Sequence, residues 1–189
     1  MIRTICLTTL LLALAGPASA HPGHEVSGFL HPFTGIDHLL AMVGVGMWAA
    51  FLAVRKPAAA LLVPAAFLAM MAMGAAAGFA GIKLPIVEAV ILGSVFVIGG
   101  LIMAAVRLPS AAAMAIAGLF AVFHGYAHAL EAPASDERTY ILGFLAATTL
   151  LQAAGLGLGW IVLRAVGDLG MRVLGGVVMA GGVLVLATN

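Results

Sequence analysis

Long apolar runs separated by short polar breaks fill the chain from residue 36 almost to its end. Each run is close to the roughly 20 residues that an α-helix needs to cross the hydrocarbon core of a bilayer. The apolar residues are continuous and do not alternate with polar ones, so membrane-spanning strands are not expected. We therefore predict an all-α polytopic membrane protein whose six transmembrane helices form one domain. The predicted spans are residues 36–54, 57–79, 86–106, 110–130, 140–163 and 171–187.

The first twenty residues have the pattern of a cleavable signal peptide. A positive start at Arg3 and an apolar run over residues 5–15 precede a small-residue cleavage site at residues 17–20. An uncleaved first helix is the alternative, but this apolar run is short for a membrane span. We therefore expect residues 1–20 to be removed, which leaves a mature six-helix domain of residues 21–189 that begins outside the cytoplasm.

The charged breaks between the apolar runs predict an orientation in the membrane. With the mature N-terminus outside, one side would carry five basic residues, and the other would carry only Lys83 and Arg138. The five are Arg55, Lys56, Arg107, Arg164 and Arg172. Because basic residues favour the cytoplasmic side, we expect the chain in a bacterial inner membrane with its mature N-terminus in the periplasm.

Composition excludes several classes of protein. Hydrophobic residues make up 64% of the 189 residues, charged residues make up 8%, and mean hydropathy is +1.22. Soluble domains carry about 25% charged residues, so a soluble enzyme, a disordered chain and a disulfide scaffold are excluded. The net charge of +1 gives no reason to expect nucleic acid as a partner. No G-x-x-x-x-G-K-[ST] loop occurs, so no nucleotide is expected.

The ionisable residues with metal-binding chemistry gather on the predicted outer side, where all six histidines lie. His124, His128 and Glu131 are spaced i, i+4 and i+7, which places them within about 60° of arc on one helix face. His31 precedes the first span, whose first turn holds Asp37 and His38. A proline and a glycine between them let His31 fold back over that turn. We therefore predict a polyhistidine–carboxylate site between the first and fourth spans.

Several polar positions also have simpler interpretations. Thr34 and Asp37 fit the [ST]-x-x-[DE] capping box, so Asp37 could serve only as a helix cap. Glu88 is a candidate accessory ligand, although its place in the first turn of the third span is explained slightly better by the helix dipole. Thr148 and Gln152 lie within the fifth span. Hydrogen bonding between helices is their simpler role, and the alternative is that they contact the ion on its pathway.

The available donor atoms predict the class of ion. Imidazole and carboxylate without thiolate suit a divalent first-row ion such as Ni²⁺, Co²⁺, Zn²⁺, Mn²⁺ or Fe²⁺. Cys6, the only cysteine, would leave with the signal peptide. The mature N-terminus would place an α-amine beside the His21 imidazole, with His24 close by, and we expect these two residues to capture ions. The ten methionines are interpreted as apolar packing.

Two sequence motifs resemble those of the HupE/UreJ family. Residues 31–38, HPFTGIDH, fit its H-x5-D-H motif, and residues 123–131, FHGYAHALE, fit its F-H-G-x-A-H-x-x-E motif. The resemblance extends over the whole chain, from the signal peptide through the six spans. It implies a secondary transporter that imports Ni²⁺, or in some members Co²⁺, for hydrogenase or urease systems. It also implies that the ion is handled by His31, Asp37, His38, His124, His128 and Glu131.

Two other functions stay open at the level of sequence. One is an intramembrane hydrolase that uses a bound Zn²⁺ and water, with Glu131 or Glu88 as its general base. The other is a b-type haem protein with axial histidines from the first and fourth spans. For the transporter no prosthetic group and no catalytic residue is expected, because the metal ion is then the transported substrate.

Overall fold

The computed structural model describes residues 28–133 and 137–188, which form seven helices and no strand. The helices are α2 (His31–Thr34), α3 (Ile36–Ala53), α4 (Ala59–Phe79), α5 (Val87–Met103), α6 (Ser110–Glu131), α7 (Glu137–Ala165) and α8 (Asp168–Thr188). The predicted all-α class is confirmed for this part of the chain. The predicted signal peptide and the capture residues His21 and His24 lie outside the described residues.

Six long helices occupy the six predicted apolar runs. Five of them, α3, α4, α6, α7 and α8, are long and apolar enough to cross a membrane, whereas α5 has only 17 residues. α5 stops at Met103, three residues before the predicted end of the third span at residue 106. Ala105 takes a left-handed conformation with φ of 55°, and the Val106 N–H bonds back to the Leu101 carbonyl. These are the marks of a Schellman motif, which terminates a helix.

The other helix ends differ from the prediction by at most three residues. α7 and α8 each begin three residues before the predicted starts at residues 140 and 171, with Glu137 and Asp168 in their first turns. Acidic side chains at these positions interact favourably with the positive end of the helix dipole. The first turns therefore form in sequence that is too polar to be recognised as part of an apolar run.

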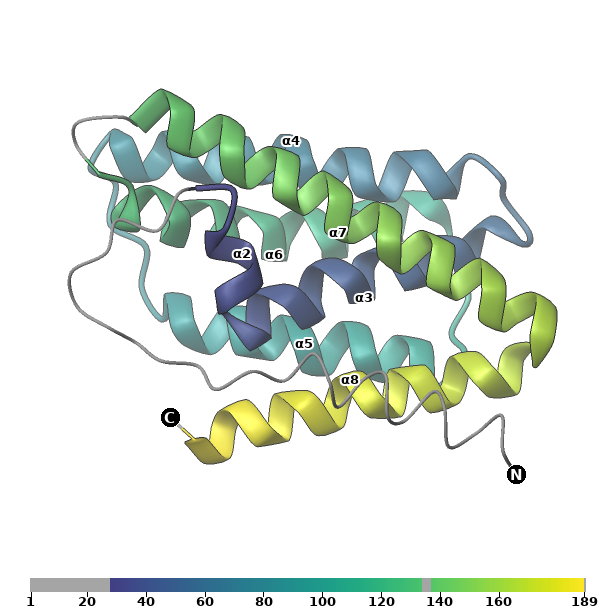
Figure 1. Ribbon diagram of the computed structural model, residues 1–189. Helices are drawn as coiled ribbons and strands as arrows, with labels where there is room; N and C mark the ends of the chain where they lie inside the picture. Colours follow the sequence, from purple (N-terminus) through teal and green to yellow (C-terminus); the bar gives the residue numbers. More distant parts are fainter. Residues whose placement is uncertain (1–27, 134–136, 189) are drawn as a thin grey trace.

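The long helices run side by side along the bundle, with α3 enclosed by its neighbours (Figure 1). Backbone contacts through glycine join them in pairs. A side chain at Gly155 of α7 would overlap the Val43 carbonyl of α3, and one at Gly125 of α6 would overlap the Met71 carbonyl of α4. A side chain at Gly175 of α8 would overlap the backbone of α5. Small residues thus permit close approach in the pairs α3–α7, α4–α6 and α5–α8.

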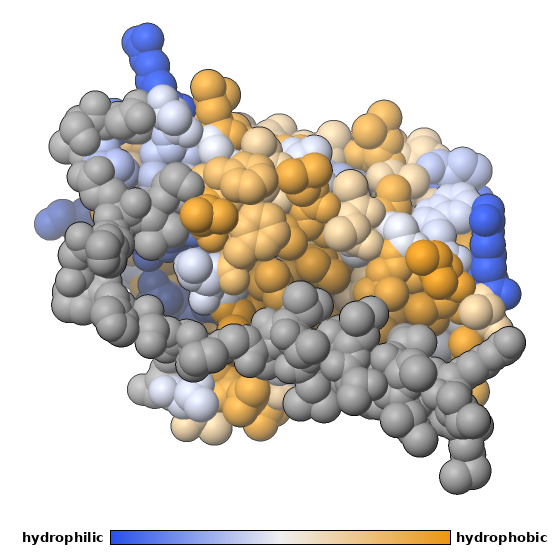
Figure 2. Space-filling model, in the orientation of Figure 1, coloured by the Kyte–Doolittle hydropathy of each residue, from blue (hydrophilic) through white to orange (hydrophobic). Residues whose placement is uncertain are grey.

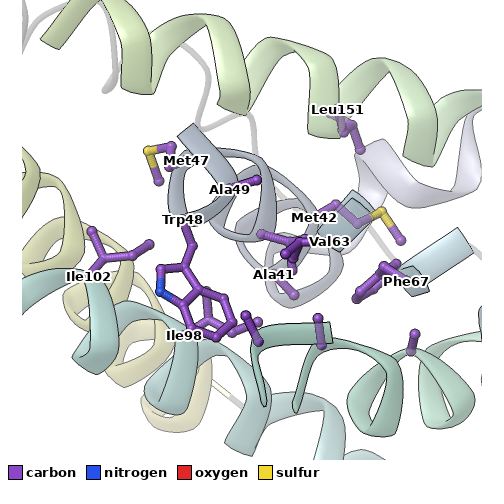
Figure 3. Packing of buried hydrophobic residues seen from close by; sticks show 14 of the residues in the cluster. Ala41, Met42, Met47, Trp48, Ala49, Val63, Phe67, Ile98, Ile102 and Leu151 are labelled. Atoms are coloured by element: carbon purple, nitrogen blue, oxygen red, sulfur yellow. The ribbon is translucent and has the colours of Figure 1, made fainter. Parts of the chain in front are cut away.

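Large apolar side chains from several helices fill the space around α3. Trp48, Met42 and Phe67 are fully buried, and Ile98 and Ile102 from α5 are buried with them. Figure 3 shows Trp48 extending from α3 toward these two isoleucines. The core therefore sits along α3, and it fixes the position of the first turn of this helix, where Asp37 and His38 lie.

The outer surface has the distribution expected for a bundle in lipid. Figure 2 shows apolar side chains over the middle of one face, with hydrophilic ones gathered toward its two ends. Exposed large hydrophobic side chains occur on every long helix except α3, for example Leu61, Leu119, Ile161 and Leu186. In water such a surface would be strongly unfavourable, whereas in a bilayer it contacts the acyl chains.

Candidate metal centre

A one-turn helix positions the first of the candidate ligands. α2 ends at Thr34, and the extended backbone of Gly35 (φ −89°, ψ 115°) separates it from α3. The Thr34 hydroxyl donates to the His31 carbonyl at 2.8 Å, and this bond stabilises the single turn of α2. The chain therefore folds back as the sequence predicts, and the His31 ring centroid lies 6.1 Å from that of His38.

Asp37 orients the neighbouring imidazole and does not act in a capping box. The N-terminal cap of α3 is Gly35, and it makes no side-chain capping bond. One Asp37 oxygen, Oδ1, accepts from the His38 backbone N–H at 2.8 Å and lies 2.9 Å from His38 Nδ1. A carboxylate accepts a hydrogen bond from Nδ1–H, which leaves Nε2 as the nitrogen that can offer a lone pair. His38 Nε2 is buried and has no hydrogen-bond partner among the described residues.

Ser94 of α5 fixes the tautomer of the deepest histidine in the same way. Its hydroxyl donates a hydrogen bond to the Ile91 carbonyl at 2.6 Å, and its oxygen lies 3.1 Å from His124 Nε2. A hydroxyl has one proton, so Ser94 must accept a hydrogen bond from His124 Nε2–H. The lone pair of His124 is then on Nδ1, which is buried and lacks a partner within the described ranges.

Aromatic side chains enclose the imidazoles. Phe144 of α7 stacks on the His128 ring with centroids 4.7 Å apart and planes at 15°. Phe67 of α4 lies 5.8 Å from the His124 ring. His128 is fully buried, and neither of its ring nitrogens has a hydrogen-bond partner in the part of the chain that is described. These walls leave the ring nitrogens without the hydrogen bonds that buried polar atoms normally make.

His31 and Glu131 close the outer end of the cluster. His31 Nε2 lies 2.6 Å from Glu131 Oε2, and their side chains are 21% and 49% exposed. One ligand atom each from His31, His128 and Glu131 can be chosen so that all three lie within 4.8 Å of one another. A single cation can therefore contact all three residues at the accessible end of the site.

The four histidine rings pack against one another between this exposed end and the interior of the bundle. Ring centroids are 5.0 Å apart for His31 and His128, 5.0 Å for His128 and His38, and 4.9 Å for His38 and His124. His31 is partly exposed, whereas His128 and His124 are fully buried. These four rings, called the histidine row below, join α2, α3 and α6 and place ring nitrogens between the partly exposed His31 and the fully buried His124.

The structure brings together the six residues assigned to the metal by sequence, but it does not place Glu88 among them. Glu88 is exposed in the first turn of α5, and the trio of close ligand atoms does not include it. Thr148 and Gln152 are buried, one and two turns along α7 from Phe144. Sequence reasoning missed Ser94. The available signal was that Ser94 is the only hydroxyl residue in α5, and such a group inside a membrane span needs a partner.

Comparison with known proteins decides the family. The family described as HupE / UreJ protein matches residues 9–185. The chain belongs to the HupE/UreJ family. It is 42% identical over 187 residues to Protein HupE of Rhizobium leguminosarum bv. viciae, which covers 95% of this chain and 96% of that protein. No solved structure matches the chain. The resemblance on the two HupE/UreJ motifs is thus supported by similarity over nearly the whole chain.

Proposed function

We propose that the chain is a secondary transporter that imports Ni²⁺, and Co²⁺ in competition, across the bacterial inner membrane for a hydrogenase or urease. The observation that carries this proposal is the histidine row, in which His38, His124 and His128 hold ring nitrogens buried without hydrogen-bond partners among the described residues. Neutral imidazole nitrogens are ligands for divalent first-row ions. Membership of the HupE/UreJ family, which is associated with nickel and cobalt transport, supports the same conclusion.

In the proposed pathway the ion enters between His31 and Glu131 and exchanges water for imidazole along the histidine row. Asp37 and Ser94 act by orienting His38 and His124, as partners of metal-ligating histidines commonly do. No nucleotide is required, because a divalent cation moving inward gains about 4.6 kcal/mol per 100 mV of membrane potential.

The proposed topology has six spans after a cleaved signal peptide. The 17 residues of α5 rise about 26 Å, which nearly matches the hydrocarbon core once the flanking residues are counted. The mature N-terminus, with His21 and His24 as capture residues, is then periplasmic. Replacing both histidines by Ala should lower uptake only when metal is limiting, and uptake equal to wild type under that condition would contradict the capture role.

Uptake of radiolabelled Ni²⁺ into proteoliposomes tests the function directly. The wild-type chain should accumulate Ni²⁺ when the interior is negative, and His124→Ala with His128→Ala should lower the initial rate by about 100-fold because two buried ligands are lost. Co²⁺ and Zn²⁺ added in excess measure selectivity. Glu88→Gln is the matched control, because this exposed carboxylate lies apart from the metal-ligand trio, and it should transport as wild type.

Wild-type uptake by the double histidine variant would overturn the assignment of the site. No contact in the described structure favours the zinc hydrolase or the haem protein over the transporter. Turnover of a lipid ester or amide in detergent, or a Soret band in the purified protein, would nevertheless identify either one.

A further inference from the structure

A second group of potential ligand atoms lies in the core beside the histidine row. Thr148 Oγ1 of α7 is 3.3 Å from the Met42 sulfur of α3 and 3.7 Å from the Met71 sulfur of α4. All three side chains are fully buried. Three helices thus bring one hydroxyl and two thioethers to a single point, a role beyond the packing that the sequence indicates for methionine.

The Thr148 hydroxyl does not make the bond that a helical threonine ordinarily makes. Thr149 and Thr188 donate to the carbonyl four residues earlier in their own helices, at 2.8 and 3.0 Å. This local bond is the usual way for a helical threonine to satisfy its hydroxyl. Thr148 instead directs its proton to thioether sulfur, which is a weak acceptor. A cation can therefore displace this bond at little cost and use the hydroxyl oxygen.

The position of this group relates it to the histidine row. Met42 lies one helical turn beyond His38 on α3, and Thr148 lies one turn beyond Phe144, whose ring stacks on His128. The Met71 backbone packs against Gly125, the residue that follows His124. The three side chains therefore lie next to the deep end of the histidine row, where a cation that leaves His124 would need new ligands.

Gln152 adds an unsatisfied polar group one turn further along α7. It is 2% exposed, and neither atom of its amide has a hydrogen-bond partner in the described residues. Buried amides normally have partners, and one inside a membrane span is costly without them. Its oxygen is a further neutral donor beyond the thioethers.

We propose that Met42, Met71 and Thr148, followed by Gln152, form a transit site for a transition-metal cation that has left the histidine row. This inference rests on the proposed transport function and adds a step to it. Thioether sulfur suits soft and borderline cations, whereas Mg²⁺ and Ca²⁺ require oxygen ligands. All four side chains are uncharged, so they hold the cation less tightly than the row of imidazoles and Glu131, and they release it inward.

The test separates transport from binding. Met42→Leu with Met71→Leu keeps the apolar volume nearly constant and removes both sulfurs. We expect the initial rate of Ni²⁺ uptake into proteoliposomes to fall by about tenfold, as for loss of supporting ligands at other metal sites. Equilibrium binding of Ni²⁺ to the purified protein, which reports the histidine row, should stay unchanged. Met73→Leu is the control, because Met73 is exposed on the same helix as Met71.

A second pair of variants decides the matter if the double leucine variant does not fold. Thr148→Val removes the hydroxyl with little change of shape and should slow Ni²⁺ uptake. Thr148→Ser keeps the hydroxyl and should take up Ni²⁺ at nearly the wild-type rate. Uptake at the wild-type rate by the double leucine variant, or by Thr148→Val, overturns the transit site. Failure of the proposed function would be seen differently, as absence of Ni²⁺ uptake by the wild-type chain itself.

Discussion

Single hydrogen bonds decide which ring nitrogen of His38 and of His124 can contact a cation. Asp37 accepts a hydrogen bond from His38 Nδ1–H, and Ser94 accepts one from His124 Nε2–H. The two rings therefore present opposite nitrogens, Nε2 and Nδ1, and both of these atoms are buried without a partner among the described residues. At the residue scale, Asp37 and Ser94 orient the imidazoles of the site without needing to contact the ion.

Ser94→Ala tests this preparation. His124 Nε2–H loses its acceptor, so the ring is free to rotate or to change tautomer, and we expect Ni²⁺ affinity to fall by about tenfold. Thr149→Ala is the matched control, because the Thr149 hydroxyl bonds only within its own helix. Isothermal titration of the purified variants measures both affinities. Equal affinity of Ser94→Ala and wild type would contradict an orienting role for Ser94.

The sequence indicates which candidate ligands lie together better than it indicates the contact between Ser94 and His124. The spacing of His124, His128 and Glu131 places them on one helix face wherever the helix packs, because helical periodicity is local. The contact between Ser94 and His124 joins residues 30 positions apart on different helices. Such a contact depends on how α5 packs in the bundle, which no local pattern encodes.

At the scale of helices, glycine determines how closely the pairs approach. Gly155 of α7 faces the Val43 backbone of α3, whereas a side chain at Gly157, on the same helix, would meet nothing within 4 Å. The two glycines have nearly the same sequence context but very different surroundings. Replacing each glycine by alanine therefore distinguishes two effects on stability. One is the close helix packing at Gly155, and the other is the low helix propensity that both glycines share.

Gly155→Ala should lower the free energy of unfolding by about 1–3 kcal/mol, because the new methyl group overlaps backbone that cannot move aside alone. Gly157→Ala should leave stability unchanged or raise it by up to about 1 kcal/mol, since alanine favours the helix. Denaturant titration in detergent, followed by circular dichroism, measures both. Equal stability of the two variants would show that the α3–α7 contact is looser than the structure indicates.

The apolar runs predict the positions of the long helices, because each run is set by the thickness of the membrane. They do not predict the end of α5, where the left-handed Ala105 makes a turn that glycine more often supplies. They also leave the helix pairs undetermined. A glycine-rich stretch indicates that some backbone approaches it, but not which one.

For the whole molecule, the candidate ligands and Ser94, which orients His124, are divided among the three helix pairs. His38 and Thr148 belong to the α3–α7 pair, His124 and Met71 belong to the α4–α6 pair, and Ser94 belongs to the α5–α8 pair. The site therefore exists only when the pairs are assembled. A cation bound there contacts more than one pair and stabilises the assembled bundle relative to the separated helices.

Ni²⁺ should accordingly raise the thermal stability of the purified protein. A free concentration 100 times the Kd corresponds to about 2.7 kcal/mol of stabilisation for one site. Differential scanning calorimetry in detergent should show a rise in Tm with Ni²⁺ and none with Mg²⁺. The rise should disappear in the His124→Ala, His128→Ala variant. A Tm that does not respond to Ni²⁺ in the wild-type chain would argue against a site shared between helix pairs.

Because the ligands are divided among helix pairs, tighter binding of an ion should slow its release into the cytoplasm. An ion held between two pairs restrains the relative motion of those pairs, and inward passage requires exactly such motion or an exchange of ligands between them. The ion that binds most tightly is then the slowest to leave. Cu²⁺ forms the strongest complexes with nitrogen donors among these divalent ions. If the chain transports as proposed, Cu²⁺ should therefore inhibit it and not be its best substrate.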